Sequence, residues 1–323
     1  MIGRRSDRSF GPGALECTPL LLVALSIAGC GSGNSVSPST DDLPPLRYVT
    51  SDSGTEDRTP CFSPDGELLL FERRFTDTDR SELFVVPVAG GAPRPLTASP
   101  LPVRPSRPSW SRHVGDIAFT GLAGDGRFGV WLIAPDGSGV REVLATGLSD
   151  EVLYPAWYQD GRHMVVVDFG GGEGGVIKRI DTQRGVAEPL TDRRDVLAGM
   201  PSVSPNGKAI AFAGQKGRRY LQERNRIWLL DRKGVWELDP RQGRTPAWSP
   251  DGKWVAFESD RGSPDGSYAV FVVPRDGGRV RQVTPFEINA NHPKWSPDGQ
   301  QIAFSARSEQ DEWRHIALVD FPF

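Results

Sequence analysis

Cysteine is scarce in this chain of 323 residues, which contains only three, at positions 17, 30 and 61. A fold held together by several disulfide bonds is therefore excluded. Beyond the N-terminal region the sequence has no long apolar run. The one run near the N-terminus is shorter than a membrane span. An excess of basic side chains is absent too, because 38 Lys and Arg face 41 Asp and Glu and leave a net charge of −3. We therefore expect no nucleic-acid partner.

The apolar run near the N-terminus has the features of an export signal. Three arginines precede the run Leu20–Ala28, which is too short to span a bilayer. Ile27-Ala28-Gly29-Cys30 resembles the bacterial lipobox, in which the cysteine is lipidated and becomes the first residue of the mature chain. We predict a signal peptide over residues 1–29, lipidation at Cys30 and membrane attachment through that lipid. A plain signal peptide with an incidental cysteine is the alternative.

Residues 30–45 consist mostly of Gly, Ser, Pro, Asn, Thr and Asp, a composition that cannot bury a core and predicts a flexible tether. Gly31 after the predicted lipidated cysteine is not the aspartate associated with inner-membrane retention, so we expect the outer membrane, on its periplasmic side. Cys61 is then left without a partner. Other copies of the repeat described next have Ser or Ala at its position, so we interpret it as a small packed residue.

The remainder of the chain repeats a frame of twelve residues six times. Its clearest copy, Pro246–Phe257, reads Pro-Ala-Trp-Ser-Pro-Asp-Gly-Lys-Trp-Val-Ala-Phe. Ser-Pro-Asp-Gly suits a tight turn between two strands, since proline fixes φ and glycine adopts positive φ. The leading prolines are separated by 48, 47, 46, 45 and 47 residues. A period in the mid-forties built of short strands is typical of β-propeller blades. We predict an all-β, six-bladed β-propeller with four-stranded antiparallel blades over residues 46–323.

The ends of the chain complete one blade in this prediction. Each frame supplies the two inner strands of a blade, and an apolar run after it supplies the third, such as Val270–Val273. The last repeat has no segment left for a fourth strand, whereas the spare segment Leu46–Thr50 precedes the first repeat. We therefore expect the N-terminal strand to complete the last blade and close the ring, which removes open sheet edges.

The frame Pro-x-Trp-Ser-Pro-Asp-Gly-x-x-(Ile/Val)-Ala-Phe resembles the β-propeller repeat of the TolB family, over residues 46–323. The resemblance implies a periplasmic propeller that takes part in protein interactions. TolB itself carries an N-terminal α/β domain before its propeller and is soluble. Here a tether and a predicted lipid occupy that place.

Recognition residues are expected on the loops at the mouth of the central channel, between each outer strand and the next frame. The residues immediately before the leading prolines should form a ring there: Thr59, Arg107, Tyr154, Met200, Thr245 and His292. Because these side chains differ chemically, the ring suits a peptide or loop of an envelope protein better than a symmetric metal site. We predict a non-catalytic protein-interaction module, with no catalytic residue, no metal and no cofactor.

Two other classes of function stay open. Six-bladed lactonases hold a central divalent ion with Glu, Asn and Asp, which Asn289 and Asn291 with Glu56 or Asp150 could imitate. A metal-dependent lactonase or lyase is therefore one alternative, and a carbohydrate-binding module is the other. A Gly-x-Ser-x-Gly nucleophile motif is absent. The other residues expected on the mouth loops are Asp57, Glu151, Arg193, Arg194 and Asp195. Gly214–Arg226 is expected to form a long basic loop that could contact acidic lipids, polysaccharide or an acidic partner.

Overall fold

The computed structural model of the protein describes residues 43–78, 80–172, 174–217, 219–308 and 312–321. The predicted signal peptide, Cys30 and most of the predicted tether lie outside these residues. Within the described ranges, the only helical element is the short 3₁₀ turn η2 (Gln222–Arg224). No described helix has the length and apolar character that crossing a membrane would require.

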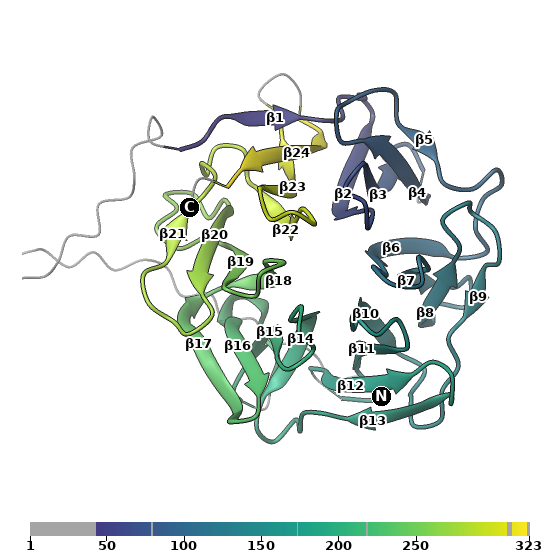
Figure 1. Ribbon diagram of the computed structural model, residues 1–323, viewed down its shortest axis with the longest axis vertical. Helices are drawn as coiled ribbons and strands as arrows, with labels where there is room; N and C mark the ends of the chain where they lie inside the picture. Colours follow the sequence, from purple (N-terminus) through teal and green to yellow (C-terminus); the bar gives the residue numbers. More distant parts are fainter. Residues whose placement is uncertain (1–42, 79, 173, 218, 309–311, 322–323) are drawn as a thin grey trace, which may run out of the picture. The chain divides into compact units, whose positions relative to one another are not determined.

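The described chain forms six antiparallel sheets of four strands around a central channel (Figure 1), which confirms the predicted propeller. The innermost strands are β2 (Thr55–Phe62), β6 (Arg104–Trp110), β10 (Val152–Trp157), β14 (Leu197–Val203), β18 (Arg244–Trp248) and β22 (Asn291–Trp295). The second strands are β3 (Leu68–Phe75), β7 (Ile117–Leu122), β11 (His163–Asp168), β15 (Ile210–Gln215), β19 (Trp254–Ser259) and β23 (Gln301–Arg307). The third strands are β4 (Ser81–Pro87), β8 (Phe128–Ile133), β12 (Val176–Asp181), β16 (Arg226–Asp231), β20 (Ala269–Pro274) and β24 (Arg314–Asp320). The outer strands are β5 (Arg94–Pro95), β9 (Arg141–Glu142), β13 (Val186–Pro189), β17 (Gly234–Gln242), β21 (Arg281–Gln282) and β1 (Leu46–Tyr48).

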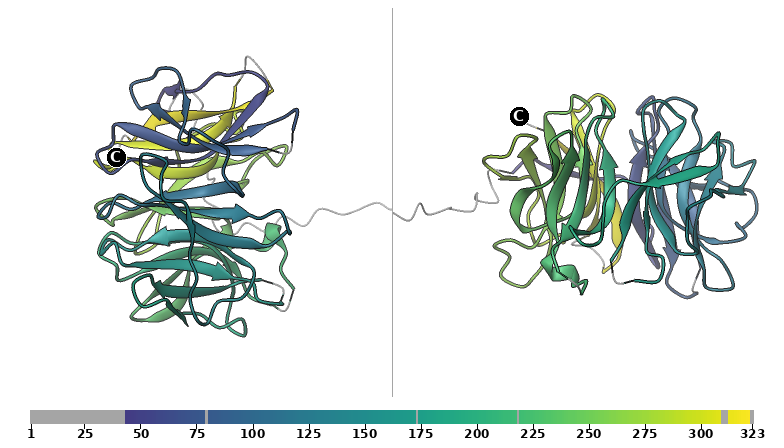
Figure 2. Two further views of the ribbon diagram at one scale, coloured as in Figure 1. Left: turned by 90° about the vertical axis from the view of Figure 1, so that its right-hand side faces the viewer. Right: turned by 90° about the horizontal axis from the view of Figure 1, so that it is seen from below.

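The N-terminal strand closes the ring as predicted. β1 lies beside β24 on the rim of the last blade (Figures 1 and 2) and pairs with it in antiparallel register, with Leu46 opposite Val319 and Tyr48 opposite Ala317. Beyond the strand, the Val49 N–H donates a hydrogen bond of 2.7 Å to the Ile316 carbonyl. The blade therefore joins the two ends of the described chain by main-chain hydrogen bonds.

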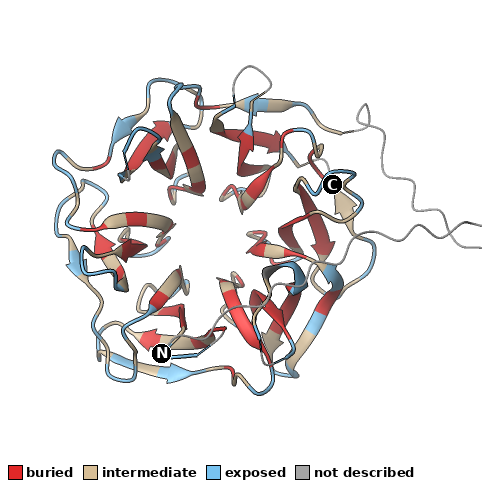
Figure 3. Ribbon diagram, turned by 180° about the vertical axis from the view of Figure 1, so that it is seen from behind, coloured by how far each residue is buried: buried red, intermediate tan, exposed pale blue. Residues whose placement is uncertain are grey.

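The hydrophobic core lies between the blades and follows the inner strands (Figure 3). Five of the six frames end in a fully buried phenylalanine: Phe71, Phe119, Phe212, Phe257 and Phe304. Blade three has the smaller Val166 at this position, also fully buried. Each of the six apolar clusters combines side chains from two neighbouring blades. Burial of apolar surface therefore fixes each blade to the next one.

The Ser-Pro-Asp-Gly turns stabilise one end of the channel. In blade five, the Ser249 hydroxyl donates to Asp251 at 2.6 Å and accepts the Trp254 N–H at 2.9 Å. Gly252 has φ of +70°, and a Cβ there would lie 3.2 Å from Cγ of Pro205 in the preceding blade. The turn glycine thus permits both the backbone conformation and the close approach of the neighbouring turn.

Candidate functional site

Each innermost strand contains a β-bulge at its leading proline, where the register with the second strand shifts. Proline has no N–H to donate to the ladder, so pairing is interrupted at that position. The residue before each proline adopts the left-handed conformation. The φ angles are 51° for Thr59, 51° for Arg107, 60° for Tyr154, 51° for Met200, 47° for Thr245 and 58° for His292. Only one other non-glycine residue in the described ranges, Asn289, has positive φ.

The expected placement of these six residues on loops is wrong. They lie inside the innermost strands, because the strands begin before the proline; β2, for example, begins at Thr55, four residues before Thr59. A proline commonly marks the start of a strand, whereas here a bulge accommodates it within one. The bulges bring all six residues together around one narrow section of the channel, which they line with five of the six leading prolines and Lys294. We call these six residues the channel ring.

Side chains of the preceding blade hold the channel ring in place. The Tyr154 N–H donates to the Thr120 hydroxyl at 3.0 Å, and the His292 N–H donates to the Glu258 carboxylate at 2.7 Å. These bonds satisfy donors that the bulges remove from the sheet. The Arg107 guanidinium lies 4.7 Å from the centroid of the Tyr154 ring, a cation–π contact between neighbouring blades. Contacts with the preceding blade therefore restrain the backbone of Tyr154 and His292, and the cation–π contact links Arg107 to Tyr154.

Two further hollows lie on the two sides of the ring. We call the opening away from the turns the mouth; its lining residues are Arg58, Arg107, Met200, Arg244, Glu258, Asn291, His292 and Arg314. The opposite opening is lined by the turns and by aromatic side chains, among them Trp110, Trp157, Trp248 and Trp295. Lys294 lines both the narrow section and the turn-side opening. The mouth is thus rich in arginine, and the other end is rich in tryptophan.

The electrostatics of the mouth act on His292. Burial, followed by the nearby charges of Arg107, Arg314, Arg244 and Arg58, lowers the pKa of His292 well below its usual value. The histidine is therefore neutral at neutral pH. Burial and then the charge of Arg58 lower the pKa of Arg314 to about 10, so this guanidinium stays protonated. The positive charge of the mouth comes from its arginines.

The other expected mouth residues do not converge. Only Asn291 lines the mouth. Asp57 is fully buried and accepts two hydrogen bonds from Arg73, at 2.7 and 2.8 Å. Glu56 pairs with Arg58 at 2.5 Å, and Asn289 accepts the Tyr268 N–H at 3.0 Å. The remaining members lie at the surface or partly exposed: Asp150, Glu151, Arg193, Arg194 and Asp195. Among the described residues, no group of three or more His, Cys, Asp or Glu side chains is positioned to hold a metal ion.

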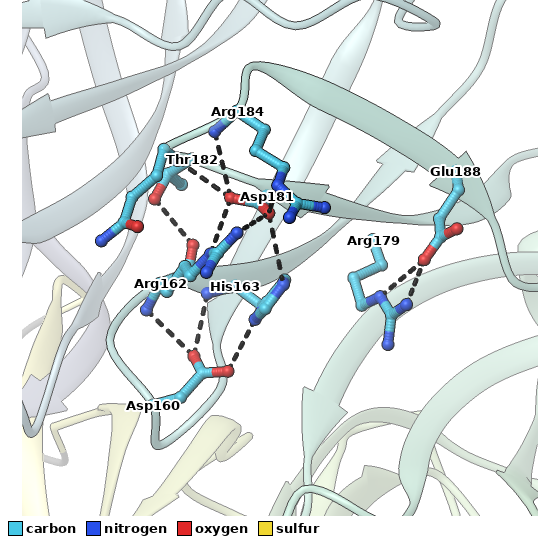
Figure 4. Close-up of polar contacts among 9 residues, drawn as sticks. Asp160, Arg162, His163, Arg179, Asp181, Thr182, Arg184 and Glu188 are labelled. Carbon is cyan, nitrogen blue, oxygen red and sulfur yellow. Dashed lines mark hydrogen bonds and ion pairs between the residues drawn. The ribbon is translucent and has the colours of Figure 1, made fainter.

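His163 belongs to a polar cluster of blade three, away from the mouth (Figure 4). Its Nδ1 lies 2.6 Å from Asp160, whose carboxylate also accepts the His163 and Arg162 N–H groups. Arg162 forms an ion pair with Asp181, which lowers the pKa of this carboxyl group. The carboxylates of Asp160 and Asp181 both have partners within the cluster. We therefore interpret the cluster as a set of structural contacts that stabilise the turn between β10 and β11.

The predicted basic loop is shorter than expected. Gly214 and Gln215 belong to β15, and Arg226 begins β16, because the strands of blade four extend further than the apolar residues alone indicate. Lys216 lies over the Trp228 ring at 5.5 Å. At least one basic side chain of this segment, Lys216, thus contacts an aromatic ring of its own blade.

Sequence reasoning missed five charged residues of the channel. Arg58 and Arg244 directly precede ring residues and Lys294 follows a leading proline, so aligned copies of the repeat could have found them. Glu258 follows the phenylalanine of its frame. Arg314 begins β24 and reaches the mouth from the third strand of its blade, a placement that only the structure shows.

The fold and the ring define a six-bladed β-propeller with a constricted channel and a basic mouth. No protein-family model matches the chain. A 77-residue segment, 24% of this chain, is 31% identical to the Tol-Pal system protein TolB of Francisella tularensis, of which it covers only 17%.

Solved structures with the same fold include two TolB proteins. Putative TolB from Agrobacterium tumefaciens has a TM-score of 0.63 and 19% identity, covering 86% of this chain and 97% of that one. TolB from Acinetobacter baumannii has a TM-score of 0.59 and 18% identity, covering 85% of this chain and 65% of that one. Oligogalacturonate lyase from Vibrio parahaemolyticus has a TM-score of 0.54 and 12% identity, covering 88% and 95%. The propeller resembles that of TolB in its repeats and its fold, and one fold hosts many functions.

Proposed function

We propose that this protein is a bacterial envelope protein of the periplasm whose propeller binds a segment of another envelope protein at the mouth, without a catalytic step. The similarity to TolB supports an envelope role, and the exported, tethered N-terminus predicted from the sequence agrees with it. The channel ring and the mouth supply the binding surface.

The composition of the channel ring carries this proposal. A left-handed backbone suits glycine, and two of the six residues, Thr59 and Thr245, are β-branched types that fit it poorly. Strained non-glycine residues persist where their side chains are needed, and they cluster at functional sites. Six such residues converge on one section of the channel, and Arg107 and Tyr154 are of the types that dominate binding hot spots.

Site-specific photocross-linking in cells tests this proposal. A benzoylphenylalanine at position 154 of the full chain is expected to give a discrete cross-linked envelope protein. The same group at position 253, where the lysine side chain is 75% exposed on a turn, serves as the control. Cross-links from position 253 with none from position 154 would overturn the proposed mouth site.

We further propose that lipid on Cys30 anchors the protein in the outer membrane. The lipobox resemblance supports this, and stable anchoring takes more than one acyl chain, as a bacterial lipoprotein has. Cys30→Ser is expected to release the chain from washed membranes or to leave it as an uncleaved precursor. A cleaved Cys30→Ser protein that still sediments with membranes at high salt would contradict the lipid anchor.

A metal-dependent lyase or lactonase is the competing function, because a propeller of the same fold is the oligogalacturonate lyase named above. Elemental analysis of the purified chain, with melting curves before and after chelation, separates the two. A metal bound only to the native state would stabilise it. One equivalent of a divalent metal together with a melting point lowered by chelator would favour the enzyme.

A further inference from the structure

The mouth concentrates positive charge from four blades. Arg58 comes from blade one, Arg107 from blade two, Arg244 from blade five and Arg314 from blade six. Among the described residues, Glu258 is the only carboxylate that lines the same hollow. The hollow has a volume of about 250 Å³, slightly below the range of about 300–1,000 Å³ typical of small-molecule pockets.

Two of these arginines have carboxylate partners. Arg244 pairs with Glu258 at 3.0 Å, and both side chains are largely buried. Glu258 also accepts the His292 N–H, so its charge is engaged by two groups. Arg58 pairs with Glu56 at the edge of the mouth. The Nε atoms of Arg58 and Arg244 are nevertheless buried without a hydrogen-bond partner among the described residues.

The other two arginines have no carboxylate partner in the described part of the chain. Arg107 makes a cation–π contact with Tyr154. It forms neither a hydrogen bond nor an ion pair with any described residue. Arg314 donates to the Asn289 carbonyl at 2.9 Å. The carboxyl group of Glu72 lies near Arg107 and Arg58; burial raises its pKa, and its described hydrogen bond, at 3.4 Å, is with the Thr59 hydroxyl. A partly desolvated guanidinium with free donors is a strong site for a carboxylate.

A further basic side chain, whose pKa is lowered by burial, lies below the ring. Lys294 lines the narrow section, and the described structure gives it no ion pair or hydrogen bond. The corresponding residues of the other five copies are all small: Cys61, Ser109, Ala156, Ser202 and Ala247. A single lysine at this level therefore faces small neighbours that leave room beside it. An anionic group that passed the ring would meet this lysine, and its negative charge would favour the protonated form of the amine.

We propose that the mouth recognises an acidic peptide segment of the partner, with its carboxylates paired to Arg107 and Arg314 and the segment directed toward Lys294. This inference rests on the proposed function and adds the chemistry of the partner. Because the whole chain carries a net charge of −3, the basic character belongs to this site and not to the protein as a whole. Electrostatic complementarity of this kind sets partner choice.

Fluorescence anisotropy with two labelled peptides, hexaglutamate and hexaglutamine, tests the inference on the purified full chain. We expect hexaglutamate to bind at least about 10-fold more tightly than hexaglutamine, since charge-assisted hydrogen bonds exceed neutral ones. Binding should weaken steeply as salt rises, because exposed charges are screened. Equal binding of the two peptides would overturn the inference.

Three variants locate the binding. Arg107→Gln and Arg314→Gln should each weaken hexaglutamate binding about 10-fold or more. Arg184→Gln, which removes a side chain that is 76% exposed on the turn between β12 and β13, is the matched control and should bind as the unmodified chain does. Circular dichroism verifies that each variant is folded. If one mouth variant fails to fold, the other still decides, and unchanged binding in a folded mouth variant contradicts the assignment.

The two proposals fail in different ways. A partner cross-linked from position 154 whose capture is insensitive to salt, in a protein that ignores hexaglutamate, would overturn the acidic-segment inference and leave the interaction role intact. Hexaglutamate binding lost in Arg107→Gln, with no cross-linked protein in cells, would instead overturn the protein partner and leave an anion site.

Discussion

The two ends of the central channel use the same backbone conformation and fill it with different residues. At the turns, the left-handed positions of all six blades are glycines: Gly66, Gly115, Gly161, Gly207, Gly252 and Gly299. In the channel ring, the left-handed positions of all six blades are side chains other than glycine. Both sets lie on one rigid scaffold, so backbone geometry alone does not explain the difference.

The surroundings of the two sets explain it. At three of the six turns a Cβ on the glycine would crowd the preceding blade, at 2.8 Å from Val114 for Gly161, 3.2 Å from Pro205 for Gly252 and 3.0 Å from Pro250 for Gly299. The ring residues instead line the channel. The turn end therefore serves the assembly of the ring, and the opposite end keeps side chains in an unfavourable conformation for use in binding.

The largest expected effect is at the turn end. Gly299→Ala should lower the free energy of unfolding by about 2–3 kcal/mol, because it combines a left-handed alanine with crowding against Pro250. Gly277→Ala is the matched control, since Gly277 also has positive φ but nothing within 4 Å of a Cβ. Chemical denaturation should show a smaller loss for the control. Equal losses would mean that contact between turns contributes nothing.

At the mouth, the expected effect is on binding. Tyr154→Ala should weaken capture of the cross-linked partner by about 2 kcal/mol, because it removes an aromatic anchor and the platform under Arg107. Its melting temperature should stay near that of the unmodified protein. Titration of the purified partner measures the first quantity and a thermal scan the second. A Tyr154→Ala protein that melts early but binds normally when folded would reverse the division between the two ends.

His292 gives a smaller effect that depends on pH. Its pKa in the folded state lies well below the unfolded value near 6.5, so the unfolded chain takes up a proton that the native chain does not. Stability is therefore complete above about pH 6.5 and falls as the pH drops below it. His292→Thr, which copies the ring residue of blades one and five, should remove up to about 2 kcal/mol of this decline by pH 5. Denaturation at pH 7.5 and pH 5 measures it, and identical declines would show that His292 titrates normally.

Much of the fold follows from local chemistry that the sequence displays. The Ser-Pro-Asp-Gly turns recur with a mid-forties period, and the spare segment Leu46–Thr50 predicted the closing pair of β1 and β24. The six ring positions were also identifiable, because each leading proline marks one. Their φ angles were not, since a proline can begin a strand or lie within a bulge, and only pairing with the second strand decides between the two.

The charge of the mouth was less predictable. Arg58 and Arg244 are one residue from the ring, but the alternation of side chains along a bulged strand is broken, so their direction could not be counted from the repeat. Arg314 arrives from a different strand. Whether an arginine is available to a binding partner also depends on the carboxylate with which it pairs in the fold. Such ion pairs, for example Arg244 with Glu258, join residues of different strands.

The most direct test of the division between the two ends replaces the ring residues by the residue their backbone favours. Purified protein with Arg107→Gly, Tyr154→Gly and Met200→Gly together should be assayed for unfolding and for capture of the cross-linked partner. We predict a folded protein whose stability changes by less than about 1 kcal/mol per site, since relief of strain offsets lost contacts and backbone entropy, and whose capture is abolished. A variant that loses its fold, or that folds and still captures the partner with unchanged affinity, would contradict the account.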